Sequence, residues 1–163
     1  MPDNKSSNIN ELRDFTCFED YDKVPGFVIS QTAYAIRKSI AKNIKEAGFD
    51  ITPQEFAILN RLATHPSLNQ RMLAELTYKD RPAVTRMLTH LMSKGLVEKQ
   101  TCNNDRRAYL VGLTKKGKKV RDLIVPIAQK VLHQALDGTK IKDIEITIKT
   151  LHKITANLDQ QDG

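Results

Sequence analysis

Residues 69–119 read NQRMLAELTYKDRPAVTRMLTHLMSKGLVEKQTCNNDRRAYLVGLTKKGKK. The apolar spacing predicts two helices joined by a tight turn, and the Val- and Leu-rich runs at 96–100 and 108–113 predict two short strands. A polar turn with basic residues separates these strands. A helix of this kind can enter a DNA major groove, and a ribbon of this kind can reach the neighbouring backbone or the minor groove.

The same segment carries the charge of the chain. It holds twelve basic and four acidic residues, a net charge of +8 that exceeds the +7 of all 163 residues. A sequence pI near 9.4 with the charge concentrated in one segment favours a polyanionic partner, either nucleic acid or an anionic membrane surface. The plain alternative is a solvated basic surface. No basic amphipathic anchor helix is evident, so the membrane is the weaker of the two partners.

The rest of the composition narrows the class of protein. The length suits one compact domain with helical extensions. No apolar run approaches the roughly 20 residues that span a bilayer, and the N-terminus lacks the apolar stretch of a secretion signal, so we expect a cytoplasmic protein without a membrane partner. We find no glycine-rich phosphate loop, nucleophile elbow or paired-carboxylate motif, and therefore expect neither an enzyme nor a cofactor. The four histidines have no metal-binding spacing, so no metal is predicted.

Periodicity and punctuation divide the chain into five parts. We expect a partly disordered arm over 1–26, a dimerisation helix over 27–50, a winged helix-turn-helix over 51–117, C-terminal dimerisation helices over 118–158 and a disordered tail over 159–163. The first of these helices has an apolar face at Ala33, Ile36, Ile40, Ile44 and Ala47. Pro126 interrupts the first C-terminal helix, where we expect a kink or a break.

Helix starts and ends are marked by residues with capping chemistry. Thr52, Pro53 and Glu55 form a capping-box pattern. Asn69, Asp80 and Thr114 stand where the next three helices should start, and Gly48, Gly95 and Gly138 stand where helices should end.

The helix between Asp80 and Gly95 has two contrasting faces. Val84, Leu88 and Leu91 form an apolar stripe. On the opposite face stand four polar residues: Arg81, Thr85, Arg86 and Thr89. The stripe would dock the helix and leave the polar face for a ligand. The flanking helices also carry apolar faces, which a two-fold dimer interface would cover, although packing within one chain is the alternative.

These elements in this order resemble the multiple-antibiotic-resistance regulator (MarR) family. The resemblance covers roughly residues 27–158. Its motifs are Val84-Thr85-Arg86-Met87-Leu88, Lys94-Gly95-Leu96-Val97-Glu98, Asp105-Arg106-Arg107 and Val111-Gly112-Leu113-Thr114 with Gly117. The resemblance implies a mainly α fold with a small β-wing, and a homodimeric regulator that binds double-stranded DNA at a pseudo-palindromic operator. Whether the outcome is repression or activation is left open, with repression preferred.

The resemblance also implies roles for individual residues. Thr85 and Arg86 would face base edges, and Arg107 would reach the minor groove with Asp105 orienting it. Arg86 is the first choice for a sequence-specific contact, since arginine can make a bidentate contact with guanine. The remaining expected DNA contacts are Gln70, Arg71, Arg81, Thr89 and Arg106. Arg81 has phosphate as an alternative target, and Gln70 and Arg71 stand at a helix start, where phosphates often bind.

Two further expectations concern regulation. The family often binds small aromatic or phenolic effectors, for which the lining residues here would be Phe27, Tyr34, Arg37 and Phe56, although each could equally be core or interface. Some members sense peroxides through a cysteine early in the first long helix, close to where Phe27 stands here. Cys17 lies upstream of that position and Cys102 lies in the wing turn, so a redox-responsive regulator is an alternative, as is a winged-helix protein-interaction module.

Overall fold

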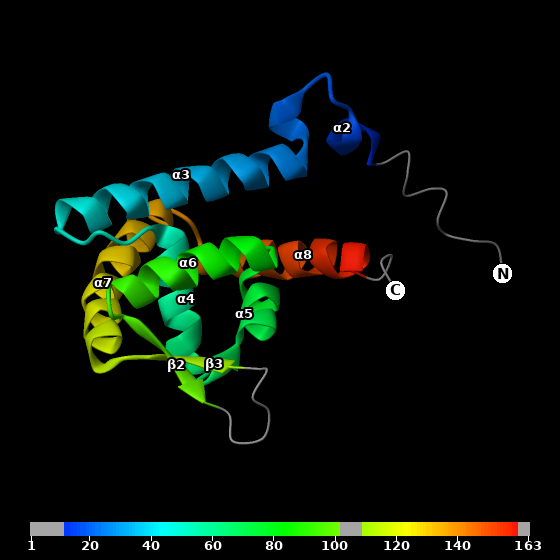
Figure 1. Cartoon of the computed structure of the whole chain (residues 1–163). Helices are drawn as coiled ribbons and strands as arrows, with labels where there is room; N and C mark the ends of the chain where they lie inside the picture. The colour runs from blue at the N-terminus through cyan, green and yellow to red at the C-terminus, as the bar shows by residue number, and fades with distance from the viewer. Residues whose placement is uncertain (1–11, 102–108, 160–163) are drawn as a thin grey trace. The chain divides into compact units, whose positions relative to one another are not determined.

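A computed structural model describes residues 12–101 and 109–159. The chain forms two compact units, Met1–Val131 and Leu132–Gly163, which are treated separately below. The described residues are mainly helical with one small antiparallel sheet, as the sequence predicts (Figure 1).

The elements follow one another with short connections. In chain order they are α2 (Arg13–Thr16), the 3-10 helix η1 (Tyr21–Lys23), α3 (Pro25–Glu46), α4 (Pro53–Thr64), β1 (Leu68–Asn69), α5 (Gln70–Thr77), α6 (Arg81–Ser93), β2 (Val97–Thr101), β3 (Tyr109–Leu113), α7 (Lys115–Ala135) and α8 (Ile141–Asp159). α2 and η1 lie in the segment expected to be an arm, and the sequence did not predict them.

The capping residues confirm the predicted helix starts. The Thr52 hydroxyl accepts from the Glu55 N–H at 3.2 Å, and Glu55 Oε2 accepts from the Thr52 N–H at 2.8 Å, which completes the capping box of α4. Asn69 Oδ1 accepts from the Met72 N–H at 2.8 Å, Asp80 Oδ1 from the Ala83 N–H at 2.6 Å, and Thr114 Oγ1 from the Gly117 N–H at 2.9 Å. Each bond satisfies a helix N–H that has no partner within its helix.

The wing is a three-stranded sheet in the order β1-β3-β2. Val97 pairs with Leu113 in the β2–β3 ladder, and Leu68 pairs with Val111 in the β1–β3 ladder. β1 has only two residues, which is too short to produce a period-two pattern, so the sequence did not predict it.

One apolar core holds this first unit together. Its fully buried side chains come from every helix from α3 to α7 and from the sheet: Ile44, Ile58, Leu59, Leu73, Val84, Leu91, Val111 and Ile124. α7 contributes Ile124, Ala128 and Val131, and it runs through Pro126 as one continuous helix. A break at Pro126 is therefore wrong. Pro126 itself is exposed, so its ring meets solvent and its missing N–H removes a single helix bond.

α8 makes up most of the second unit. It carries apolar residues along its length, yet none of its residues is buried. Its large exposed side chains are Ile141, Ile146, Ile148, Ile154 and Leu158. Among the described helices, none is both long and apolar enough to cross a membrane.

Gly117 fixes the wing against the start of α7. A Cβ at this position would lie 1.9 Å from the carbonyl oxygen of Leu96. That oxygen also accepts from the Thr114 N–H at 3.1 Å. The backbone of the wing therefore approaches α7 at a distance that only glycine permits.

Gly117→Ala should lower the free energy of unfolding by about 1–3 kcal/mol or more, because backbone must move to make room for the methyl group. Gly26→Ala is the matched control, since this helical glycine has no atom within 4 Å of an added Cβ. The control should be neutral or stabilise by roughly 0.5–1 kcal/mol. Urea denaturation measures both, and equal effects of the two substitutions would contradict the close approach.

Candidate nucleic-acid interface

α6 is held in the core by its apolar stripe. Val84 and Leu91 are fully buried and Leu88 is 2% exposed. These positions follow the helical spacing of four and three residues, so the stripe fixes which side of the helix faces the core. It therefore also fixes which residues remain outside.

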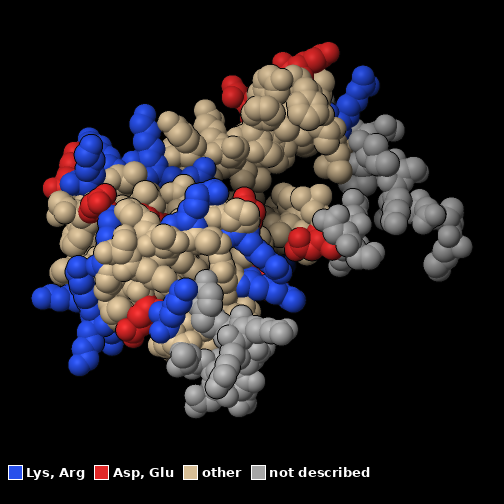
Figure 2. Space-filling model, in the orientation of Figure 1, with Lys and Arg blue, Asp and Glu red and all other residues tan. Residues whose placement is uncertain are grey.

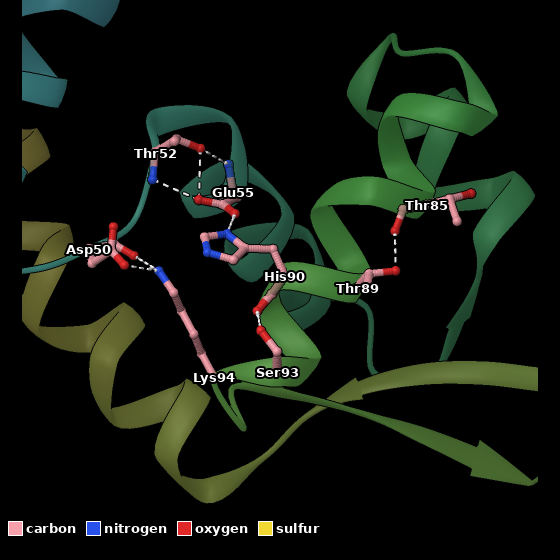
Figure 3. Close-up of polar contacts among 8 residues, drawn as sticks. All are labelled: Asp50, Thr52, Glu55, Thr85, Thr89, His90, Ser93 and Lys94. Carbon is pink, nitrogen blue, oxygen red and sulfur yellow. Dashed lines mark hydrogen bonds and ion pairs between the residues drawn. The ribbon is translucent and has the colours of Figure 1, made fainter.

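The opposite face of α6 presents the four polar residues predicted from the sequence. Arg81, Thr85, Arg86 and Thr89 are all exposed. The Thr85 hydroxyl donates to the Arg81 carbonyl at 2.8 Å. The Thr89 hydroxyl donates to the Thr85 carbonyl at 2.9 Å (Figure 3). A threonine hydroxyl that donates in this way still has lone pairs with which to accept. Within residues 12–101 and 109–159, the guanidinium groups of Arg81 and Arg86 form no ion pair.

α5 contributes polar groups beside this face. Gln70 Nε2 donates to the Thr85 hydroxyl, which ties the first turn of α5 to the middle of α6. Arg71 pairs with Glu75 of the same helix at 2.9 Å. An exposed pair of this kind contributes at most about 1 kcal/mol, so Arg71 can exchange Glu75 for another anion at little cost. Figure 2 shows Lys and Arg side chains beside α5 and the neighbouring end of α6, and others spread around the rest of this face.

Two polar ties hold α6 against the start of α4. In the first, Nδ1 of His90 donates to Glu55 Oε1, while the other oxygen of Glu55 accepts from the N–H and the hydroxyl of Thr52 (Figure 3). In the second, Lys94 Nζ donates to Asp50 Oδ2 at 2.6 Å and also to the Asp50 carbonyl oxygen. Both contacts are made by residues in the last turn of α6 or just after it. They therefore hold this end of α6 against the start of α4.

Glu55 is the one buried charged residue among the described residues, with 3% of its surface exposed. Burial raises the pKa of its carboxyl and is the largest single influence, but hydrogen bonds from His90 and Thr52 together outweigh it, so the pKa lies below its ordinary value. A buried carboxylate held by three donors stabilises the folded state only while it is ionised. At Asp50 the hydrogen bond and charge of Lys94 lower the pKa of the carboxyl.

Some of the residues predicted to contact DNA are not among those that the structure describes. Asp105, Arg106, Arg107 and Cys102 lie outside the described residues, so their roles remain predictions. At the base of the wing, Lys116 Nζ donates to the Lys94 carbonyl at 2.8 Å and so links the start of α7 to the end of α6.

The four residues predicted to line an effector site do not all meet. Phe27, Tyr34 and Arg37 line an open hollow of about 520 Å³ on α3, together with Tyr21 of η1. The rings of Tyr21 and Phe27 lie 4.3 Å apart. Phe56 is buried in the core instead.

Sequence reasoning missed the two ties of α6. The capping box pointed to Glu55, but nothing in the spacing of Glu55 and His90, 35 residues apart, indicated that they meet. Cys17 is half-buried after α2 and forms no disulfide. Across the described parts of the chain, no group of three His, Cys, Asp or Glu side chains is arranged to hold a metal ion.

The arrangement of α5, turn, α6 and a β-wing defines a winged helix-turn-helix. Residues 51–109 match the model of the MarR family. The predicted resemblance is thereby confirmed, and the chain carries a MarR family domain over its helix-turn-helix and the first half of its wing.

Solved structures share the fold over most of the chain. A mutant of MarR from E. coli complexed with operator DNA has a TM-score of 0.74 at 24% identity, covering 82% of this chain and 95% of that one. BpsR from Bordetella bronchiseptica, whose DNA binding is regulated by 6-hydroxynicotinic acid, has a TM-score of 0.76 at 18% identity, covering 83% and 96%. CouR from Rhodococcus jostii, bound to p-coumaroyl-CoA, has a TM-score of 0.72 at 18% identity, covering 83% and 94%. At these identities the likeness establishes the fold.

Glu55→Gln should lower the free energy of unfolding at pH 7 by about 1–3 kcal/mol, because the amide cannot accept from all three donors. The difference from the wild type should shrink as the pH falls below the ordinary carboxyl pKa of 4.5, since the stabilisation by a carboxylate with a lowered pKa is lost when it is protonated.

Urea denaturation at several pH values between 3 and 7 measures this effect. Glu46→Gln, at an exposed residue 3.8 Å from Lys42, is the control and should leave stability nearly unchanged. A difference for Glu55→Gln that stays constant from pH 7 to pH 3 would contradict the role of its charge.

Proposed function

We propose that this protein is a transcriptional regulator that binds double-stranded DNA at specific operators. The observation that carries the proposal is the face of α6: four exposed polar residues opposite a fully buried stripe, on the second helix of a helix-turn-helix. A helix docked in this way can enter the major groove, where each base pair presents a distinct pattern of donors and acceptors. We place this function in the cytoplasm.

The proposed DNA-contact residues differ in the part of the DNA that each would contact. Thr85, Arg86 and Thr89 would face base edges, with Arg86 as the residue that reads guanine. Gln70, Arg71 and Arg81 would contact phosphates at the margin of the groove. Arg107 of the wing, oriented by Asp105, would reach the neighbouring minor groove, and Arg106 would lie beside the DNA backbone.

A homodimer supplies the second half-site contact. Large apolar side chains are exposed on the helices outside the winged unit: Val28, Ile29 and Tyr34 on α3, and Ile141, Ile146, Ile148, Ile154 and Leu158 on α8. Several large exposed apolar side chains on a helix are typical of an association site. A two-fold pair would place two copies of α6 about one DNA turn apart, which explains a pseudo-palindromic operator.

Binding of a small aromatic or phenolic effector would release the protein from DNA. The hollow offers the aromatic rings of Phe27 and Tyr34, the cation of Arg37 and the carboxyl group of Asp22, which suits a planar ligand with a phenolic group. The BpsR and CouR structures support this class of ligand. An effector bound there would act only by preferring one dimer geometry over another, and repression relieved by the effector is the outcome we propose.

Arg86→Ala should reduce the preference for an operator, selected from a random duplex pool, over scrambled DNA by roughly tenfold or more, since a bidentate guanine contact contributes about 1–3 kcal/mol. Competition binding measures the ratio. Arg61→Ala is the control, an exposed arginine on α4 outside the proposed contacts. Wild-type binding should also weaken steeply with salt. Unchanged discrimination would count against the role of Arg86. A flat salt titration would count against DNA as the partner and favour the protein-interaction module.

The dimer has its own test. Sedimentation should give twice the chain mass of 18.5 kDa, and Ile148→Asp should shift the protein toward the monomer because a charge would enter an apolar contact. Lys153→Asp places an aspartate at a position of α8 that is already charged, about 140° around the helix from Ile148, and should disturb the dimer less. A monomeric wild type would overturn the proposed assembly.

DNA binding that is lost after peroxide treatment would favour the redox alternative through Cys17 or Cys102.

A further inference from the structure

The turn between α5 and α6 contains a tyrosine in a conformation that tyrosine rarely adopts. Tyr78 has φ 51° and ψ 48°, in the left-handed region. A residue with a Cβ is strained there, and bulky residues are uncommon in it. Its side chain is also 83% exposed, so no burial of apolar surface offsets the strain.

The hydrogen bonds show why the backbone takes this conformation. The Tyr78 N–H donates to the Glu75 carbonyl at 3.2 Å, and the Lys79 N–H donates to the Ala74 carbonyl at 3.1 Å. This is the Schellman arrangement that ends a helix with one left-handed residue. It turns the chain from α5 into α6, so the left-handed residue is required by the helix-turn-helix itself.

The same chain uses glycine for the same task twice. α3 ends at Gly48, with φ +80° and donation from the Gly48 and Phe49 N–H groups to Lys45 and Ile44. α6 ends at Gly95, with φ +66° and donation from the Gly95 and Leu96 N–H groups to Met92 and Leu91. Glycine adopts this conformation without strain. Of these three helix ends, only that of α5 has a large side chain at the left-handed position. This difference indicates that the side chain is functional.

The surroundings of Tyr78 are suited to an anion. It lines a shallow hollow of about 480 Å³ with Arg71, Lys79 and Arg81. The two acids of the hollow are already engaged, Glu75 with Arg71 at 2.9 Å and Asp80 with the Ala83 N–H at 2.6 Å. Across the described residues, the Tyr78 hydroxyl has no hydrogen-bond partner.

We propose that Tyr78 is a DNA-contact residue whose hydroxyl donates to a backbone phosphate at the margin of the major groove that α6 enters. Tyrosine hydroxyls are among the groups that bind DNA phosphates and set the register of a protein on the duplex. The strain in the turn is then the cost of holding a rigid donor beside Arg71 and Arg81. This inference rests on the proposed function and adds a residue that neither the sequence motif nor the family resemblance indicated.

Two variants separate strain from contact. Tyr78→Phe keeps the backbone and the ring and removes only the hydroxyl. Its affinity for the selected operator should fall by about tenfold. The ratio of operator to scrambled DNA should not change, because a phosphate contact carries no sequence information. The slope of affinity against salt should also stay the same, because an uncharged hydroxyl releases no counterion.

Tyr78→Gly removes the strain together with the contact. Its Tm should rise by about 2–4 °C while its affinity for the operator falls at least as far as that of Tyr78→Phe. A protein that becomes more stable and binds DNA less well has lost a functional group and not a structural one.

Thermal unfolding and fluorescence anisotropy on the full chain measure both quantities. An affinity of Tyr78→Phe within twofold of the wild type would overturn the proposed contact. A Tm of Tyr78→Gly below that of the wild type would overturn the inference that the turn is strained. If the wild type prefers no duplex at all, the proposed function itself fails. A wild type that prefers its operator while both variants match it removes only the role of Tyr78.

Discussion

The docking of α6 through Val84, Leu88 and Leu91 is the constraint on which the rest of the site depends. Because the helix repeats every 3.6 residues, burial of this stripe leaves Arg81, Thr85, Arg86 and Thr89 outside. The apolar stripe fixes the rotation of the helix about its axis. The ties from His90 to Glu55 and from Lys94 to Asp50 fix its position along that axis. A recognition helix needs both its rotation and its position to be fixed, because a shift by one base pair along the DNA changes every contact.

A second set of contacts fixes the wing relative to α6. Leu96 follows the left-handed Gly95 directly, and its carbonyl oxygen accepts from Thr114 and leaves no room for a Cβ at Gly117. α6, the sheet and the start of α7 therefore meet at one backbone position.

Local chemistry made much of this predictable from the sequence. Thr52, Asn69, Asp80 and Thr114 cap helices within three residues of themselves, so their roles can be read without knowing the fold. The stripe of α6 has the same local character.

The features that the sequence did not predict depend on distant or weakly patterned residues. β1 is two residues long and exists only because β3 pairs with it. The partnership of Glu55 with His90 joins two helices across 35 positions. Pro126 is tolerated because its ring faces solvent on a helix that Ile124 and Ala128 hold in the core. For Phe56 the sequence left open an effector contact and a place in the core, and the structure places it in the core.

The central claim is that the polar face of α6 lies in the major groove of its operator. Methylation protection at guanine N7 tests it most directly, because this atom is exposed only in the major groove. We expect protected guanines in two clusters, with centres about 10–10.5 base pairs or a multiple apart, on DNA bound by the wild type. Undiminished methylation of every guanine in a duplex that the protein demonstrably occupies would contradict the account.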